Sequence, residues 1–464
     1  MMGRREDRQG QFFYEFNLDK VVPPDHLVRK IDAVLDLGWV HRELAPFYSH
    51  TGRPSIDPVL MIRMLVIGYV FAIRSERRIC AEVQVNLAYR WFCRLGIEDR
   101  LPDHSVFSRA RHERFREGNV LRRVFERVVE TCIATGLVGG EAFSIDASLI
   151  KADVDKHKRI PGGNTTQWPN SEQASRAVRE YIEALDAASR EQDVGRGAPS
   201  NERDGGETRK EVSLVDPQAT WIARKGIDTT FYYDANYLID NRFGIIVDAE
   251  GTRANRREET TLTETMLARV MDRFSMRPKR LAGDTAYGTG RLLRWLVDRK
   301  ITPHIPVWDK SARQDGMFSK ADFTYDRERN VYVCPAGKDL THSGLIDQGR
   351  ILPYRASSYY CRRCDLKPRC TKANARKISR DIDEDVRDYV RSLGGTQAFE
   401  QSARERKKVE MRFAHMKRIH KLDRLRLRGL SGAKDEVLLT ALAQNLKRLA
   451  KFVCQSAEPR PMPA

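Results

Sequence analysis

The chain has 464 residues, with 82 Lys and Arg against 64 Asp and Glu, a formal net charge of +18 and an isoelectric point near 9.6. This length allows two or three domains, and the positive excess predicts a polyanionic partner, nucleic acid before membrane. The longest apolar run, Val59–Ile73, is interrupted by Arg63 and is too short for a membrane span. The N-terminal segment MMGRREDRQGQFF lacks the apolar core of a secretory signal, and the scattered cysteines favour a reducing, cytoplasmic location.

Residues 1–135 are expected to form a mainly helical domain. Asp57-Pro58 predicts the start of a buried helix. The later segment LPDHSVFSRARHERF places several arginines after Asp103 or Ser105, either of which could cap a helix. A short helix, a turn and a basic helix are the outline of a helix-turn-helix DNA reader, while a solvated basic face is the alternative. The bases that would contact DNA are Arg109, Arg111 and Arg114.

Residues 136–308 are expected to form the first part of a sheet domain, with strand patterns from Glu141 onward. Residues 142–145 predict a short strand that stops at Asp146, and residues 280–283 predict another that ends at Asp284. Three strand patterns between them, followed by alternating strands and helices, predict a mixed α/β sheet. Residues 151–212 are polar and are expected to form an inserted, partly disordered loop around one helical patch, Ser171 to Ser189.

Residues 309–395 are expected to form a second insertion. It contains one C-x2-C pair and two further cysteines, which fits a tetrahedral structural zinc site, with four buried or loosely placed thiols as the alternative. The four residues are Cys334, Cys361, Cys364 and Cys370. Two C-terminal helices over residues 396–454 then complete the sheet domain, and residues 455–464 are expected to be disordered.

The first of these C-terminal helices carries an acid between bases. On a helix, Arg406, Glu410 and Lys417 fall on one stripe beside an apolar stripe, so Glu410 is expected near the edge of a core. An exposed helix supported by Arg–Glu pairs is the alternative. The window 404–428 holds eleven bases and three acids, a concentration that favours contact with phosphate.

Asp146 and Asp284 each end a predicted strand, and strand ends in α/β sheets are where sites gather. Each alone could be a capping or turn residue. With Glu410 they would form a group of three carboxylates, which repel one another and need a cation. Hard oxygen ligands suit Mg²⁺ or Mn²⁺, and two such ions would hold the attacking and leaving oxygens in phosphodiester displacement. A basic protein with this site is expected to act on nucleic acid.

Five segments also carry a family resemblance: PDHSVFSRAR, FSIDASLIKAD, DANYLIDNRFGIIVDA, LAGDTAYG and AQNLKRLAKF. Together they resemble DDE transposases of bacterial insertion sequences, of the group with a helical N-terminal domain and an RNase H-like catalytic domain. The Tyr-x2-Arg-x3-Glu-x6-Lys signature of that family falls on Ala403, Arg406, Glu410 and Lys417, with alanine in place of the usual tyrosine.

The resemblance implies Asp146, Asp284 and Glu410 as the catalytic set and Arg406 and Lys417 as DNA contacts. The implied function is that of a transposase, which binds the ends of its element and catalyses metal-dependent DNA cleavage and strand transfer. Element ends and target DNA would be its partners, and a homodimer or higher assembly would act on them in the nucleoid. A metal-dependent DNA nuclease on the same fold and a catalytically silent DNA-binding protein are the alternatives.

Overall fold

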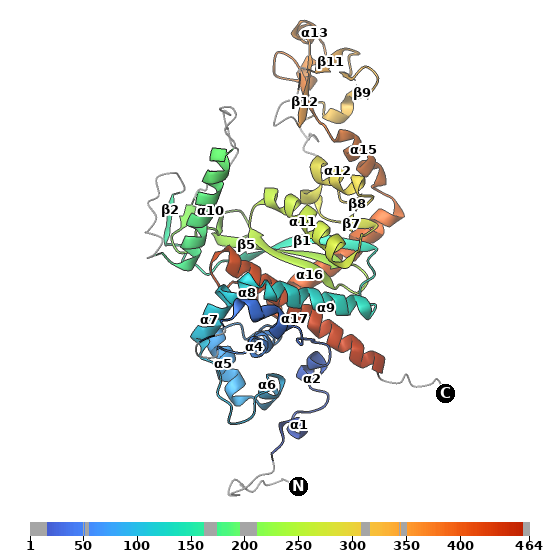
Figure 1. The fold of residues 1–464 in the computed structure, drawn as a ribbon. Coiled ribbons are helices and arrows are strands. Elements are labelled where there is room, and N and C mark those ends of the chain that lie inside the picture. Colours follow the sequence, from blue (N-terminus) through green and yellow to red (C-terminus); the bar gives the residue numbers. More distant parts are fainter. Residues whose placement is uncertain are drawn as a thin grey trace, which may run out of the picture.

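The computed structural model describes residues 16–49, 51, 55–161, 174–194, 211–307, 316–342, 344 and 350–457. Short helices form one end of the molecule, a mixed sheet lies at its centre and a smaller sheet lies at the far end (Figure 1). Residues 458–464 of the predicted disordered tail lie outside the described residues, and so does much of the predicted loop 151–212. None of the helices within these described ranges is both long enough and apolar enough to cross a membrane.

Helices alone precede the first strand in the described part of the chain, as predicted for residues 1–135. The buried helix α4 begins after Asp57, whose side chain accepts a hydrogen bond from Val59 N at 2.7 Å, with Pro58 at its first position. Asp103 caps α7 in the same way, so Asp103 rather than Ser105 begins that helix. The elements are α1 Leu18–Val21, α2 Leu27–Asp32, α3 Val40–Leu44, η1 Ala45–Phe47, α4 Pro58–Val70, α5 Glu76–Val85, α6 Leu87–Phe92, α7 His104–His112, α8 Arg114–Glu117 and α9 Val120–Ala134.

The central sheet has the strand order β6-β5-β1-β7-β8, and the short strand β4 pairs with the beginning of β5. Strand β5 runs antiparallel to β1 and β6, whereas β1, β7 and β8 are parallel. Numbered along the chain, the five main strands lie in the order 3-2-1-4-5 with only the second reversed, which is the RNase H-like topology. The predicted fold is therefore confirmed. The strands are β1 Ala142–Lys151, β4 Thr220–Ile222, β5 Thr230–Asp240, β6 Ile246–Arg253, β7 Arg280–Ala282 and β8 Thr302–His304.

The prediction that the first strand stops at Asp146 is wrong. Strand β1 continues to Lys151, because β5 is eleven residues long and pairs with β1 from Phe143–Asp240 to Lys151–Tyr232. Asp146 therefore lies within a strand, opposite Tyr237. Between β1 and β4 the described residues form β2 Arg159–Pro161, the helix α10 Arg176–Val194 near the predicted helical patch, and β3 Glu211–Ser213.

Helices cover both faces of this sheet. In Figure 1, α11 (Arg256–Phe274) and α12 (Gly290–Asp298) lie above it, while α9, α16 (Gln397–Arg418) and α17 (Gly429–Ala457) lie below. Residues 455–457, predicted to be disordered, belong to α17.

The C-terminal helix α17 lies between the sheet and the N-terminal helices, and it packs against β6, α9, α4 and α2. Its approach to β6 is close: a Cβ on Gly251 would lie 2.8 Å from the backbone of Ala433, so only glycine fits there. The buried Asn445 of α17 also accepts a hydrogen bond from Ile246 N at 3.0 Å and donates one to Ile246 O at 2.7 Å. This helix thus completes the cores of both parts of the molecule.

The second insertion forms a separate antiparallel sheet with the order β13-β12-β11-β10-β9 and a small core of its own. Residues 316–381 are named the cysteine subdomain here, and they lie at the top of Figure 1. The elements are η3 Lys320–Asp322, β9 Thr324–Asp326, β10 Val331–Val333, β11 Asp339–His342, β12 Ile351–Ala356, α13 Ser358–Arg362, α14 Lys367–Cys370 and β13 Lys377–Asp381, followed by α15 Glu384–Leu393.

Ion pairs at the start of α15 connect the cysteine subdomain to α12, which covers the central sheet. Arg294 of α12 donates to Asp385 at 2.6 and 2.7 Å and to Asp383 at 3.1 Å. The buried Glu384 lies beside them and pairs with Lys320 at 3.1 Å and Arg391 at 2.9 Å. Because a buried, multiply paired carboxylate holds its partners in fixed positions, this ionic joint orients the subdomain relative to the sheet.

Candidate active site

Asp146 lies in β1, and Asp284 lies two residues beyond the end of the neighbouring parallel strand β7, at the same level. Ser144 of β1 is opposite Ala282 of β7, and Asp284, two residues further, keeps an extended backbone with φ −83° and ψ 177°. Because side chains alternate along a strand, Asp146 faces the same side as Ser144, and Asp284 the same side as Ala282. The two carboxylates therefore project side by side from one face of the sheet.

Local hydrogen bonds orient each aspartate. Asp146 accepts a hydrogen bond from Ala147 N at 2.9 Å, and Asp284 accepts one from Ala286 N at 2.8 Å. The second bond makes Asp284 the N-cap of a short 3-10 helix, η2 (Thr285–Tyr287). Asp284 therefore is a capping residue, as the alternative from the sequence suggested, and it also lies beside Asp146.

Helix α16 packs on β1, β7 and β8 and brings Arg406 and Glu410 to this face. Its apolar stripe is buried as predicted, with Phe413 stacked on Tyr237 at a ring separation of 4.9 Å. An Arg406 nitrogen lies 3.9 Å from Asp146 Oδ2, and another lies 3.9 Å from Glu410 Oε1. The Glu410 side chain is 61% exposed, whereas that of Asp146 is 19% exposed. The site therefore has a buried end at Asp146 and an open end at Glu410.

Burial raises the pKa of Asp146 to about 6. The Ala147 N–H and Arg406 act in the opposite direction, while the charges of Asp284 and Glu410 raise the pKa further. Asp146 thus experiences the field of both other carboxylates. A carboxylate in this setting is stabilised by any added positive charge.

The donor chemistry at this face suits a hard divalent cation, because all three groups offer carboxylate oxygens. Across the described ranges, no group of three or more His, Cys, Asp or Glu side chains is arranged to hold a metal ion. In the structure, the positive charge between Asp146 and Glu410 is the guanidinium of Arg406. The three carboxylates therefore fit Mg²⁺ or Mn²⁺ in type, and holding an ion would require Glu410 and Arg406 to rearrange.

Lys417, on the same predicted stripe, lies in a different environment. Burial lowers its pKa, and the charges that act against this effect are those of Asp423 and Asp234. Lys417 is therefore half-buried, and the acids that influence it are Asp423 and Asp234 rather than those of the candidate site. Its role as a DNA contact stays a prediction.

The three N-terminal arginines have different surroundings. Arg109 is exposed, and Arg114 donates to Ser55 Oγ at 2.9 Å and lies over the Tyr48 ring. Arg111 is 3% exposed and pairs with Glu76 at 2.5 Å, joining α7 to α5. The prediction that Arg111 contacts DNA is therefore not supported, because its guanidinium is buried in an ion pair with Glu76. Sequence spacing cannot distinguish such a buried arginine from its exposed neighbours.

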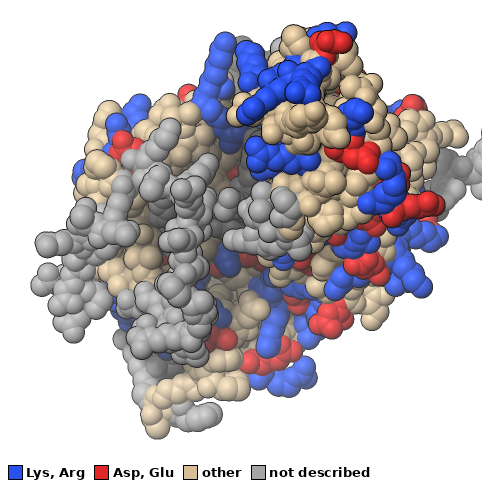
Figure 2. All heavy atoms as spheres, turned by 90° about the horizontal axis from the view of Figure 1, so that it is seen from above, with Lys and Arg blue, Asp and Glu red and all other residues tan. Residues whose placement is uncertain are grey.

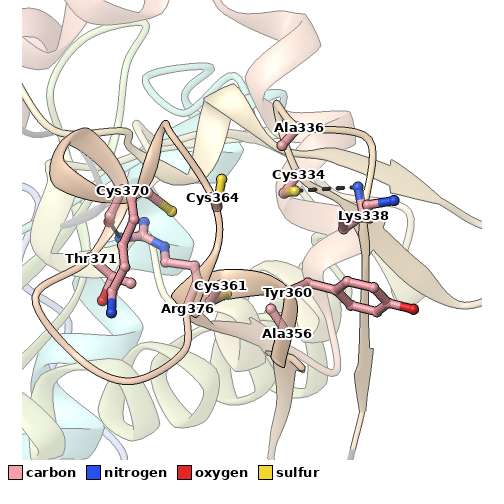
Figure 3. Close-up of a pocket in the computed structure, with 11 residues that line it drawn as sticks. Cys334, Ala336, Lys338, Ala356, Tyr360, Cys361, Cys364, Cys370, Thr371 and Arg376 are labelled. Carbon is pink, nitrogen blue, oxygen red and sulfur yellow. Dashed lines mark hydrogen bonds between the residues drawn. The ribbon is translucent and has the colours of Figure 1, made fainter. Parts of the chain in front are cut away.

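The four cysteines of the insertion line one cavity of about 40 Å³ (Figure 3), which has room for a single ion or water. Lys338 N donates a hydrogen bond to Cys334 Sγ at 3.3 Å. Burial raises the pKa of Cys370, and nearby Cys361, Cys334 and Cys364 add to the effect. The cysteines thus converge, although the described residues include no set of three arranged as metal ligands. Zinc binding stays a prediction.

Comparisons with known proteins give two family matches. A family model described as a transposase domain (DUF772) matches residues 16–113, and one described as a transposase DDE domain matches residues 333–450. A search of the curated proteins found no match. Among solved structures, a piggyBac transposase synaptic complex with hairpin DNA is 11% identical, covering 94% of this chain and 82% of its own, with a TM-score of 0.31. At that TM-score the likeness adds nothing to the topology described above.

Proposed function

We propose that this chain, which matches models of two transposase domains, binds the ends of its own element and catalyses DNA cleavage and strand transfer. The observation that carries the proposal is the position of Asp284, just after β7, beside Asp146 of the parallel strand β1, with Glu410 close enough to raise the pKa of Asp146. The net charge of +18 supports DNA as the partner.

Each residue of the site has a distinct part in the proposed reaction. Asp146 and Asp284 would hold divalent ions from the buried side, and Glu410 would complete the set from the open side. Two Mg²⁺ or Mn²⁺ ions, when bound, would neutralise the charge that develops on the attacking and leaving oxygens. Arg406, released from between Asp146 and Glu410, would then be free to contact the scissile phosphate.

The nucleophile in the proposed reaction comes from outside the protein. Water would attack in the cleavage step, and a DNA 3′-hydroxyl would attack in strand transfer, so no covalent link to the chain is required. Both steps replace one P–O bond by another, with the departing 3′-oxygen as leaving group. Because two ends and a target must be held together, a homodimer or higher assembly is part of the proposal.

The test uses the purified full chain and duplex DNA containing the sequences that flank its coding region. With Mg²⁺ or Mn²⁺, we expect cleavage at the end of an inverted repeat and joining of the released 3′-hydroxyl to a target plasmid. Asp284→Asn protein is the matched control for contaminating nucleases, since it keeps every basic residue. Sequencing of the junctions identifies both the cut and the joined strand.

The outcomes separate the proposal from its two alternatives. Cleavage without joined product in either metal would identify a nuclease. Specific binding of the ends without cleavage would identify a silent DNA-binding protein, and the 3.9 Å contacts of Arg406 would then be a permanent feature of the site. Neither outcome is compatible with a transposase.

A further inference from the structure

A second concentration of positive charge lies outside the basic window 404–428. Residues 354–380 contain nine Lys and Arg and a single acid, Asp365. They form the outer part of the cysteine subdomain, from β12 through α13 and α14 to β13. Figure 2, which looks down on this end of the molecule, shows Lys and Arg side chains grouped there. This surface is named the tip face.

Six exposed bases of the tip face have no carboxylate partner among the described residues. In contrast, Arg294, Arg350 and Arg391, nearer the ionic joint, all pair with acids. Surface charges usually occur with both signs interspersed, so a group of unpaired bases leaves a strong local positive potential. The six are Arg355, Arg362, Arg363, Arg369, Lys372 and Lys377.

Two of these bases stand directly opposite each other on neighbouring strands. Arg355 of β12 is the cross-strand partner of Lys377 of β13. Like charges in this position destabilise a sheet, and an anion bound between them would remove the penalty. The facing positive charges of Arg355 and Lys377 therefore destabilise the free subdomain, and a bound polyanion would relieve this repulsion.

Aromatic side chains accompany the bases. Tyr359 and Tyr360 are 57% and 51% exposed, and their rings pack edge to face at 5.5 Å. Arg363 donates to the Tyr359 hydroxyl at 2.6 Å and lies 4.4 Å above its ring, while Lys338 Nζ is 5.2 Å from the Tyr360 ring. Exposed tyrosines held between cations offer stacking surfaces for sugars or bases next to phosphate contacts.

We infer that the tip face is a second DNA-binding surface, separate from the carboxylate site, that contacts the phosphate backbone. The inference rests on the proposed function for its choice of polyanion, because a chain with two transposase domains meets DNA. Ion pairs of Glu384 with Lys320 and of Asp385 with Arg294 connect the subdomain that carries the tip face to α12.

The test neutralises exposed bases that pair with no acid in the described part of the chain. The variant Arg355→Gln, Arg362→Gln, Lys372→Gln and Lys377→Gln changes four such side chains of the tip face. A matched control, Arg78→Gln, Arg123→Gln, Lys279→Gln and Arg291→Gln, removes four bases that already pair with acids. Both variants lose the same charge from +18, so a general electrostatic effect would be equal in the two.

We expect the tip variant to bind duplex DNA at least about tenfold more weakly at moderate salt. Its slope of log K against log salt should fall by about 0.9 for each phosphate that the protein no longer neutralises, and the control should keep the wild-type slope. Fluorescence anisotropy across a salt series measures both. Tyr359→Ala with Tyr360→Ala tests the stacking part, and should weaken binding without changing the slope.

Equal slopes in the tip variant and the control would overturn the inference, and so would a tip variant that loses affinity only for single-stranded RNA or for acidic proteins. The proposed function fails differently, namely when wild-type protein binds DNA through the tip face but neither cuts nor joins it. Thermal unfolding of each variant shows whether the substitutions disturb the fold.

Discussion

The guanidinium of Arg406 lies 3.9 Å from Asp146 on one side and 3.9 Å from Glu410 on the other. One cation thus lies between carboxylates from a buried strand and from an exposed helix face. Positive charge between two like charges lowers their repulsion, and the effect is larger where water is excluded. A divalent ion entering the site would compete with Arg406 for both carboxylates, so Arg406 is the residue whose position is expected to depend on metal.

Arg406→Gln is expected to lower the cleavage rate at saturating DNA, because its guanidinium would contact the reacting phosphate. Arg404→Gln, on the same helix but 75% exposed and paired with Glu400, should weaken binding slightly and leave the saturated rate unchanged. Single-turnover cleavage at saturating DNA, repeated over a salt series, distinguishes rate from affinity. An Arg406 variant that cuts at the full rate would make this residue a simple phosphate anchor.

Asp284→Asn is expected to abolish cleavage while DNA binding stays equal or becomes slightly tighter, since a negative charge is lost. The amide can still accept the hydrogen bond from Ala286 N, so the cap of the following turn is kept. Parallel anisotropy and cleavage assays check both parts. Residual cleavage above background would show that Asp284 is only a capping residue.

Asp146 gives the stability of the protein a defined pH dependence. Burial raises the pKa of Asp146 from 3.8 to about 6. Between about pH 4 and 6, Asp146 is therefore protonated in the folded protein and ionised in the unfolded chain. The contribution of Asp146 to stability therefore falls as pH rises from about 4 to 6, and the full penalty is present at pH 7. Asp146→Asn should remove a penalty of up to about 3 kcal/mol at pH 7.

Denaturant unfolding of wild type and Asp146→Asn at pH 4, 5, 6 and 7 measures this difference. The two curves should converge at the acidic end and separate toward neutrality. The exposed Asp365→Asn variant is the control, since its difference from wild type should be small at every pH. A variant less stable than wild type at pH 7 would contradict the assigned cause.

Mg²⁺ or Mn²⁺ should stabilise the wild-type protein at pH 7, because binding offsets the repulsion at the carboxylates. At an ion concentration one hundred times the Kd the gain is about 2.7 kcal/mol. Thermal unfolding with and without the ion measures it, with NaCl at matched ionic strength as the control. The shift should vanish in the double variant Asp146→Asn with Asp284→Asn. An unchanged shift would locate the binding elsewhere.

Purified protein is expected to contain one zinc per chain if the four convergent cysteines bind it as thiolates. Cys364→Ser should then release the zinc and lower the midpoint of thermal unfolding, because the core of the cysteine subdomain is small. Cys454→Ser, in α17, should retain the zinc. Elemental analysis of the three proteins decides, and zinc-free wild type would leave the thiols as packing residues.

Local patterns predict those elements whose caps and apolar faces lie within the segment itself. The helix Gly290–Asp298 is such an element, with Thr289 as its cap and Leu292, Leu293 and Leu296 buried on one side. The position of Asp284 beside Asp146 could also be expected, because each aspartate follows a short apolar stretch that predicts a strand. The structure shows that these two strands pair in parallel. The family matches then confirm the resemblance to DDE transposases that the motifs indicated.

Features that depend on distant partners could not be predicted. The extension of β1 beyond Asp146 requires β5, which begins some eighty residues later in the chain. The burial of Arg111 depends on Glu76 of another helix. The tip face could not be predicted for a related reason: its bases are spread over strands and short helices, and only the fold reveals that they lack carboxylate partners among the described residues. Charge counts alone do not distinguish paired from unpaired bases.

The position of α17 has a consequence for synthesis of the chain. The N-terminal helices pack against a segment that begins at Gly429, so α4 and α9 emerge from the ribosome long before their partner. At about 5–20 residues per second, the apolar faces of these helices wait tens of seconds for it. Chaperones would have time to bind them, and ribosome-associated chains ending before residue 429 should be more sensitive to protease than the released protein.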